Sequence, residues 1–429
     1  MTTAAVHVPL SIEGLLLALS AIFVFARLFG SLAEKVGQPA VLGELLAGLV
    51  VGKSLLRLVN PATETIHMLA ELGVILLLFE IGLETDVLRL LKVGKTSLLV
   101  AIVGVAAPFG LGFAVGRIFG FGAVVSIFLG ASLTATSVGI TARVLSDLGR
   151  LEDRESQIIL GAAVIDDVLG LIILAVVGGM ASGTAPSLFG ISRIAGSAIG
   201  FVILAFVLGS WLAPRALGLV NRAKVKKSSL FFGLVFAFLL AYLAEVAGSA
   251  MIVGAFAAGL VLARTGEARS IEKEVRDIAH FFVPIFFVAV GAAIDIRSLD
   301  PRLPEGRTAL LVGSFLVLVG VAGKLLSGLA ASGSGSRRLV IGVGMIPRGE
   351  VGLIFAKIGL ASAILTPGLY GAVAMMTLFT TFVAPPWLRM LVGPVKTTGV
   401  DETLGGVADL ATNTPFEEST EGDEQGTQQ

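Results

Sequence analysis

Two neighbouring aspartates, Asp166 and Asp167, stand inside an apolar run at residues 156–181. An ionisable side chain within membrane hydrocarbon costs at least about 2.5–3.5 kcal/mol, so such residues usually have a function. Asp166 lies about ten residues into the run, or roughly 15 Å along a helix, close to the middle of a bilayer. Consecutive helical side chains point about 100° apart, so one carboxylate can face a cavity while the other reaches a neighbouring helix. The alternative is a salt-bridged pair that only pins helices together.

Lys324 is the lysine of a second apolar run, at residues 308–331. A buried ammonium needs a partner of opposite charge, and the natural partner is one of the two aspartates. An Asp–Lys pair that separates lets the lysine release its proton, so such a pair can take part in proton movement. A fixed bridge between helices is the alternative interpretation.

A third apolar run contains Pro347 and four glycines within residues 342–352. Proline removes a backbone hydrogen bond and small residues favour kinks, so the run is predicted to contain an unwound break. Arg348 and Glu350 fall at this break. They can pair with each other or hydrogen-bond to the freed backbone groups.

A cluster of hydroxyl side chains and a glycine at residues 131–139 predicts a second break, within the run at 123–147. The cluster includes Thr134 and Thr136. Freed carbonyl groups and threonine oxygens are ligands that a hard monovalent cation prefers. Two broken helices at matching positions of inverted halves are the best indication in a sequence of a transport site near the midplane.

The elements that must position these residues are membrane-spanning helices. Hydrophobic residues make up 55% of the 429-residue chain, charged residues make up 14%, and the mean hydropathy is +0.95. A soluble chain has about 25% charged residues, so this composition excludes a soluble enzyme or a nucleic-acid-binding protein. The chain has no cysteine, which excludes disulfides and thiol chemistry. No feature indicates catalysis on a substrate, so neither an enzyme nor a cofactor is expected.

About thirteen apolar runs are long enough, or nearly so, to cross a bilayer as helices. The sequence therefore predicts an all-α polytopic protein of the inner or plasma membrane. Lys and Arg are more numerous in the connections after odd-numbered runs, which predicts an N-terminus outside the cell and a C-terminus inside it. The runs lie near residues 9–29, 39–56, 66–83, 95–117, 123–147, 156–181, 190–213, 228–247, 249–265, 278–296, 308–331, 337–359 and 367–393.

The runs divide into six, one and six, so the second half can be an inverted copy of the first. The halves share no strong sequence identity, and this prediction rests on topology and on the two breaks. The sequence after Lys396 holds eight acidic residues and no basic one. Residues 397–429 are therefore expected to form an acidic disordered tail, and residues 1–396 the transmembrane domain.

Several of these segments together resemble the monovalent cation/proton antiporters. The resemblance is to the second branch of that superfamily, which includes bacterial Na⁺/H⁺ antiporters and Kef-type K⁺/H⁺ antiporters. Each segment alone is weak, but their combination and order between positions 40 and 360 are specific. The segments are GELLAGLVVG at 43–52, LGVILLLFEIGLE at 72–84, residues 129–139, GAAVIDDVLG at 161–170, FFVPIFFVAVG at 281–291, Lys324, and GMIPRGEVGL at 344–353.

The resemblance implies roles for individual residues. Asp167 would bind Na⁺ or Li⁺ and a proton in alternation, while Asp166 would pair with Lys324. The ion and proton site would comprise Asp166, Asp167, Thr134, Thr136 and Lys324, with Na⁺ held at Asp167, Asp166 and Thr134, and with Arg348 and Glu350 supporting the second break.

The resemblance also implies an architecture and a mechanism. Runs 4–6 and 11–13 would form a core domain, and runs 1–3 and 8–10 would form the dimerisation domain of a homodimer. The core would move like an elevator, and the Asp-Asp pair with its lysine resembles the electrogenic type. K⁺/H⁺ exchange of the Kef-like type remains an alternative. A sodium-coupled solute symporter, a gated channel and a membrane sensor are less consistent with the buried Asp-Asp/Lys set.

Overall fold

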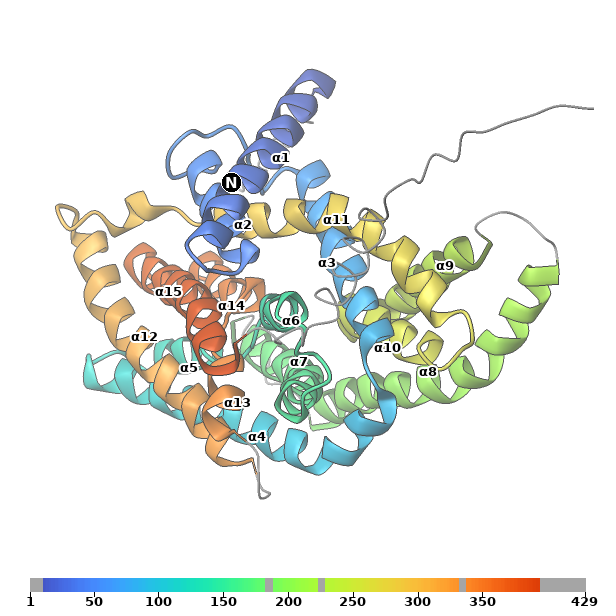
Figure 1. Cartoon of the computed structure of the whole chain (residues 1–429). Coiled ribbons are helices and arrows are strands. Elements are labelled where there is room, and N and C mark those ends of the chain that lie inside the picture. The colour runs from blue at the N-terminus through green and yellow to red at the C-terminus, as the bar shows by residue number, and fades with distance from the viewer. Residues whose placement is uncertain (1–10, 182–187, 223–227, 332–336, 394–429) are drawn as a thin grey trace, which may run out of the picture. The chain divides into compact units, whose positions relative to one another are not determined.

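The structure is a computed structural model that describes residues 11–181, 188–222, 228–331 and 337–393. All regular secondary structure within these ranges is helical (Figure 1), which confirms the predicted all-α class. The acidic tail predicted at 397–429 lies outside the described residues.

The helices follow the apolar runs of the sequence. A Ser11 side chain accepts a hydrogen bond from Gly14 N at the start of the first helix, and Asp86 caps the fourth. The elements are α1 Ile12–Lys35, α2 Ala40–Val51, α3 Glu64–Glu84, α4 Val87–Ile118, α5 Ala123–Ser132, α6 Val138–Asp147, α7 Arg154–Ala181, α8 Leu188–Arg222, α9 Ser228–Val246, α10 Met251–Leu262, α11 Ala268–Ala292, the 3-10 helix η1 Ile296–Leu299, α12 Pro304–Leu329, α13 Arg338–Gly344, α14 Glu350–Ala361 and α15 Pro367–Val392.

Each expected apolar run holds one helix, except for two runs that each hold a pair of short helices. The paired runs are 123–147, with α5 and α6, and 337–359, with α13 and α14. Within the described residues, 9 helices are long and apolar enough to cross a membrane, and shorter apolar helices accompany them. The polytopic membrane fold is confirmed, while the total of about thirteen crossings stays a prediction.

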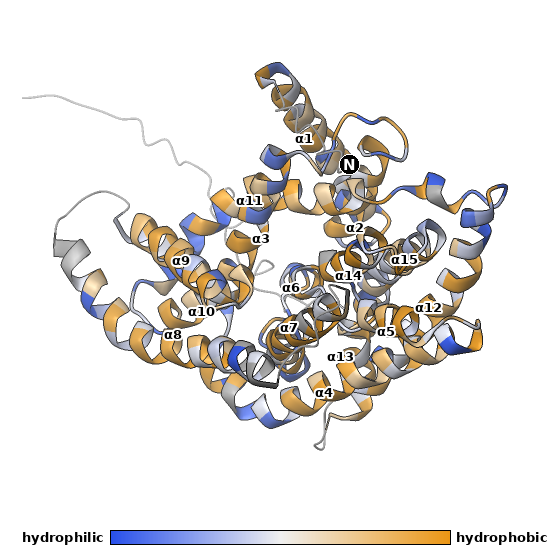
Figure 2. Ribbon diagram, turned by 180° about the vertical axis from the view of Figure 1, so that it is seen from behind, coloured by the Kyte–Doolittle hydropathy of each residue, from blue (hydrophilic) through white to orange (hydrophobic). Residues whose placement is uncertain are grey.

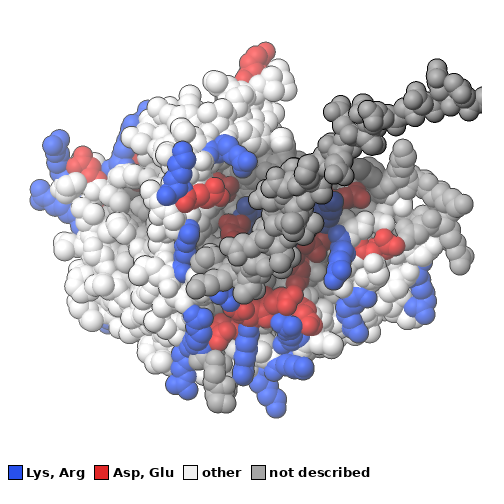
Figure 3. Space-filling model, in the orientation of Figure 1, with Lys and Arg blue, Asp and Glu red and all other residues white. Residues whose placement is uncertain are grey.

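The outer surface of the helices is largely apolar. Orange, hydrophobic segments cover most helices in Figure 2, and exposed leucines, valines and phenylalanines line α8 and α9. Figure 3 shows wide uncharged areas beside a region where acidic and basic side chains gather together. A surface of this kind suits contact with lipid, because hydrocarbon cannot hydrogen-bond to polar groups.

The helices pack in two groups. In the first group, α3 packs against α10 and α11, α1 against α2, and α9 against α10. In the second group, α4 packs against α7 and α12, and α12 against α15, around the short helices α5, α6, α13 and α14 (Figure 1). The contacts between the groups are sparse and include α6 against α2 and α3. The two groups hold the helices of the expected dimerisation and core domains, and the roles of these domains stay predictions.

The packing pattern repeats between the two halves of the chain. Four of the helix contacts have counterparts. The contact of α1 with α2 corresponds to that of α9 with α10, and the contact of α2 with α11 to that of α10 with α3. The contact of α4 with α5 corresponds to that of α12 with α13, and the contact of α4 with α7 to that of α12 with α15. Exchanging α1–α7 with α9–α15 therefore maps each of these contacts onto another. This correspondence is what two structural repeats produce, as the predicted inverted halves require.

Glycines at equivalent places allow the repeated helices to approach closely. A Cβ at Gly48 would overlap with Val288 O on α11, and one at Gly259 would overlap with Phe79 O on α3. The two short segments that contain these glycines share the pattern Gly-x-x-x-Ala-Gly-Leu-Val. They are GELLAGLVVG at 43–52 and GAFAAGLVLA at 254–263. This shared pattern lies on helices where backbone approaches backbone, which small residues permit.

We predict that Gly48→Ala destabilises the protein by about 1–3 kcal/mol, because the added methyl group has no space between α2 and α11. The matched control is Gly110→Ala on α4, where a Cβ would meet nothing within 4 Å. Apparent melting temperatures of the purified proteins in detergent measure both effects. Equal melting temperatures for the two variants would contradict the close approach of α2 and α11.

Candidate functional site

Both predicted helix breaks are present, and they contact each other. α5 ends at Ser132 and α6 begins at Val138, while α13 ends at Gly344 and α14 begins at Glu350. Ser137 N donates a hydrogen bond to Pro347 O at 2.8 Å, joining the backbone of one break to that of the other.

Threonine side chains add further links between the breaks. Thr141 Oγ1 donates to Gly344 O at 2.6 Å, and Thr136 Oγ1 donates to Met345 O at 3.4 Å. Backbone groups that the broken helices leave unpaired are therefore satisfied within the protein, as a membrane interior requires.

The buried lysine joins one of the aspartates to the first break. Lys324 Nζ lies 3.4 Å from Asp166 Oδ2, and both side chains are 0% exposed. Lys324 Nζ also donates a hydrogen bond to Thr134 O at 2.6 Å. Of the two candidate partners, the structure therefore places Asp166 against the lysine, in agreement with the resemblance.

Arg348 is fully buried at the second break and reaches towards the first. Its guanidinium donates to Gly320 O at 3.1 Å and approaches Ala135 O at 3.5 Å, while Thr381 Oγ1 donates to Arg348 O at 2.5 Å. These contacts agree with the interpretation that Arg348 satisfies freed carbonyl groups. The side chain of Glu350 lies outside the described part of the structure, so its predicted supporting role stays a prediction.

Asp167 has a different environment from its neighbour. It is partly exposed, whereas Asp166 is buried, as expected for adjacent positions on one helix. Asp167 lines a cavity of about 320 Å³, together with Thr136 and Ser137 of the first break and Gly349 of the second. The cavity lies between the two helix groups, and Glu71, Glu245 and Ser249 of the first group also line it.

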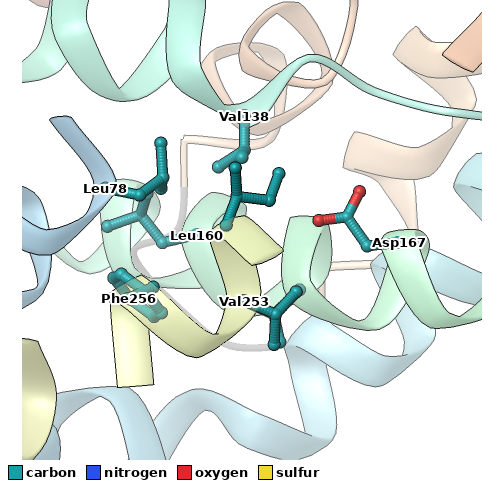
Figure 4. A pocket seen from close by; sticks show the side chains of 8 residues that line it. Leu78, Val138, Leu160, Asp167, Val253 and Phe256 are labelled. Carbon is teal, nitrogen blue, oxygen red and sulfur yellow. The ribbon is translucent and has the colours of Figure 1, made fainter. Parts of the chain in front are cut away.

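Apolar side chains close the other side of Asp167. Figure 4 shows Leu78, Val138, Leu160, Val253 and Phe256 gathered beside its carboxylate. The space among them is about 10 Å³. A space of that size holds one water at most, so the carboxylate is reached through the larger cavity and not through this apolar layer.

Thr134 and Thr136 occupy different places in the site. Thr136 lines the cavity with Asp167. The Thr134 side chain is buried and its hydroxyl donates to Ala131 O at 2.8 Å, while its carbonyl accepts from Lys324. The structure thus groups Asp167 with Thr136 and groups Asp166 with Thr134 and Lys324. The predicted Na⁺ ligands Asp167, Asp166 and Thr134 remain a prediction.

Sequence reasoning did not find a charged network at the C-terminal end of α3. Arg276 on α11 contacts Glu80 at 3.0 Å, Glu84 at 2.5 Å and Glu272 at 2.7 Å. Ser146 Oγ on α6 donates to Glu84 Oε2 at 3.3 Å, which links the two helix groups. The available signal was the four-residue spacing of Glu80 and Glu84 and of Glu272 and Arg276, which places each pair on one helix face.

The site combines crossing broken helices, a buried Asp–Lys pair, and a second carboxylate at a cavity between two helix groups. This combination defines a secondary transporter for small cations. Comparisons with known proteins agree. The family model described as "Sodium/hydrogen exchanger, transmembrane" matches residues 20–393. The chain belongs to this family, whose members are transporters.

Individual relatives are similar over most of their length. The chain is 42% identical to the high-affinity Na⁺/H⁺ antiporter NhaS3 of Synechocystis sp., covering 89% of this chain and 90% of the relative. It is 34% identical to the Na⁺/H⁺–K⁺ antiporter GerN of Bacillus cereus, covering 87% and 95%. The solved structure of the sodium proton antiporter MjNhaP1 from Methanocaldococcus jannaschii has the same fold, with a TM-score of 0.63 at 21% identity over 88% of this chain and 96% of that one.

We predict that Lys324→Met lowers stability by about 3–5 kcal/mol, because it leaves the Asp166 carboxylate buried without its cation. Asp166→Asn combined with Lys324→Met removes both charges and should recover part of the loss. Apparent melting temperatures of wild type, single and double variants in detergent measure the coupling. Additive losses in the double variant would argue against the pair.

Proposed function

We propose that this protein exchanges Na⁺ or Li⁺ for protons across the membrane, with Asp167 binding the cation and the proton in turn. The observation that carries the proposal is the position of Asp167, which lies at a cavity on one side and against an apolar layer on the other. A carboxylate that holds either a cation or a proton makes the two compete. Competition at a site that opens to one side at a time gives obligate exchange.

The two helix groups support an elevator-type mechanism. Asp166, Asp167, Lys324 and both breaks belong to the second group, and the first group supplies the opposite wall of the cavity. A shift of the second group against the first would carry Asp167 past the apolar layer around Leu78 and Phe256. In this proposal the first group is static and forms the interface of a homodimer.

The predicted orientation sets the side on which the cavity opens. The C-terminal half of α7 and the connection between α9 and α10 line the cavity. With the N-terminus outside the cell, both segments lie toward the outer surface. In this proposal the protein resides in the cell membrane, and the described conformation offers Asp167 to the outside.

The Asp166–Lys324 pair supports electrogenic exchange. If cation binding at Asp167 draws Asp166 away from Lys324, the ammonium loses the partner that stabilises its charge. The lysine would then release a proton in addition to the one displaced from Asp167. More than one proton per Na⁺ moves net charge in each cycle.

Asp167→Asn is expected to abolish cation-driven exchange, because the neutral amide cannot bind and release a proton. Proteoliposomes with an internal pH dye should then respond to external Na⁺ no more than protein-free vesicles do. Asp277→Asn, an exposed carboxylate on α11, serves as the matched control and should keep its exchange rate. Size-exclusion chromatography should show both variants folded, and exchange retained by Asp167→Asn would refute the carrier role.

Electrogenicity is tested on proteoliposomes adsorbed to a solid-supported membrane, at equal pH on both sides. Jumps of Na⁺ or Li⁺ should give transient currents that a jump of K⁺ does not. A K⁺ current would support the K⁺/H⁺ alternative. A pH change without any current would retain exchange but contradict the proton stoichiometry proposed for Lys324.

A further inference from the structure

A second pocket, remote from Asp167, lies where α4 and α7 begin. Its volume is about 410 Å³, and its lining residues come from the first two turns of α4, from the connection before α7 and from the first turn of α7. These residues are Arg89, Lys92, Val93, Glu152, Arg154 and Gln157.

Gln157 is the feature that points to a ligand. Its side chain is 0% exposed, and Nε2 donates to Leu151 O at 2.7 Å, which fixes the orientation of the amide. Oε1 has no hydrogen-bond partner among the described residues. A buried carbonyl oxygen without a donor is costly, so a pocket lined by this residue favours a ligand that carries a hydrogen-bond donor.

The remaining lining residues favour an anionic group. Arg89 is held by Asp86 at 3.3 Å and by Glu152 at 3.2 Å, whereas none of the ion pairs of the described chain involves Lys92 or Arg154. The other acids nearby face elsewhere, because Asp153 contacts Arg150 and Glu155 accepts a hydrogen bond from Arg337 N. The N-terminus of the long helix α7 adds a partial positive charge.

The same face of α4 continues into the lipid-facing surface. Leu88, Lys92, Lys95, Leu99 and Ile102 follow one another at intervals of three or four residues, and all are exposed. Lys92 is also the first residue of the apolar stretch that can cross the membrane. The pocket therefore lies at headgroup level, with apolar side chains beyond it where acyl chains run.

We propose that this pocket binds the headgroup of an anionic phospholipid that carries hydroxyl groups, of the phosphatidylglycerol type. The phosphate lies against Lys92 and Arg154, and a headgroup hydroxyl donates to Gln157 Oε1. Basic pockets at the membrane surface are suited to such lipids. Because α4 packs against α7 and α12, which carry Asp166 and Lys324, the bound lipid stabilises the second helix group.

The test uses the full-length protein in a neutral detergent and measures its apparent melting temperature with added lipid. Short-chain phosphatidylglycerol should raise the melting temperature, and phosphatidylcholine should not. Lys92→Gln combined with Arg154→Gln should weaken the apparent affinity for phosphatidylglycerol about tenfold or more. Arg215→Gln is the matched control, a membrane-surface arginine that lies over Trp211 on α8, and it should bind as wild type does.

Two further measurements test the role of Gln157 and the lipid assignment separately. Gln157→Leu should remove the preference for phosphatidylglycerol over phosphatidic acid, which lacks headgroup hydroxyls, while retaining binding of both. Glycerol 3-phosphate alone should not stabilise the protein; equal stabilisation by it would overturn the lipid assignment in favour of a soluble phosphate. Undiminished binding in the Lys92/Arg154 double variant would overturn the site itself.

Discussion

The buried ammonium of Lys324 is the interaction on which the second helix group depends. It extends from α12 and contacts Asp166 on α7 and the carbonyl of Thr134 at the first break. Removing an ammonium from water is costly, and only close oppositely charged or carbonyl oxygens offset that cost. The three elements must therefore keep their relative positions while the pair is intact. Asp167 is adjacent to Asp166 on the same helix, so any rearrangement that separates the pair also affects the carboxylate at the cavity.

At the two helix breaks, the polar groups of the backbone also need partners inside the membrane. A helix that unwinds inside a membrane leaves amide and carbonyl groups that lipid cannot satisfy. Here each break supplies partners for the other, through Ser137 N to Pro347 O and Thr141 Oγ1 to Gly344 O. Arg348 contributes its donors to Gly320 and Ala135. Contacts between the breaks therefore replace partners that the membrane interior does not offer.

The sequence predicted the positions of the breaks well, because proline, glycine and clustered hydroxyl groups all weaken a helix when they gather in one apolar run. It also predicted that Lys324 needs an aspartate. The sequence could not show that Thr136, and not Thr134, lines the cavity with Asp167, because this depends on the path of unwound backbone that has no periodicity. The contacts of Arg276 with Glu80 and Glu84 were missed for a related reason. Spacing places residues on a helix face but does not show which helix that face meets.

The two halves repeat their backbone but not their charges. The turns after α1 and α9 are alike, with Gly37 at φ 73° and Gly248 at φ 74°. Gly248 lines one cavity between the helix groups, and Glu34 and Ala40, which flank the other turn, line a second cavity. The cavity near α9 is lined by Asp167, Glu71 and Glu245 without Lys or Arg, whereas the cavity near α1 is lined by Glu34, Glu44, Arg27, Arg143 and His280. In the cavity near α9, the charged side chains that a cation meets are all carboxylates, which raises the local cation concentration. In the cavity near α1, the arginines oppose this effect. Gradients alone set the direction of coupled exchange, so this asymmetry acts on the rates of loading and release and not on the equilibrium.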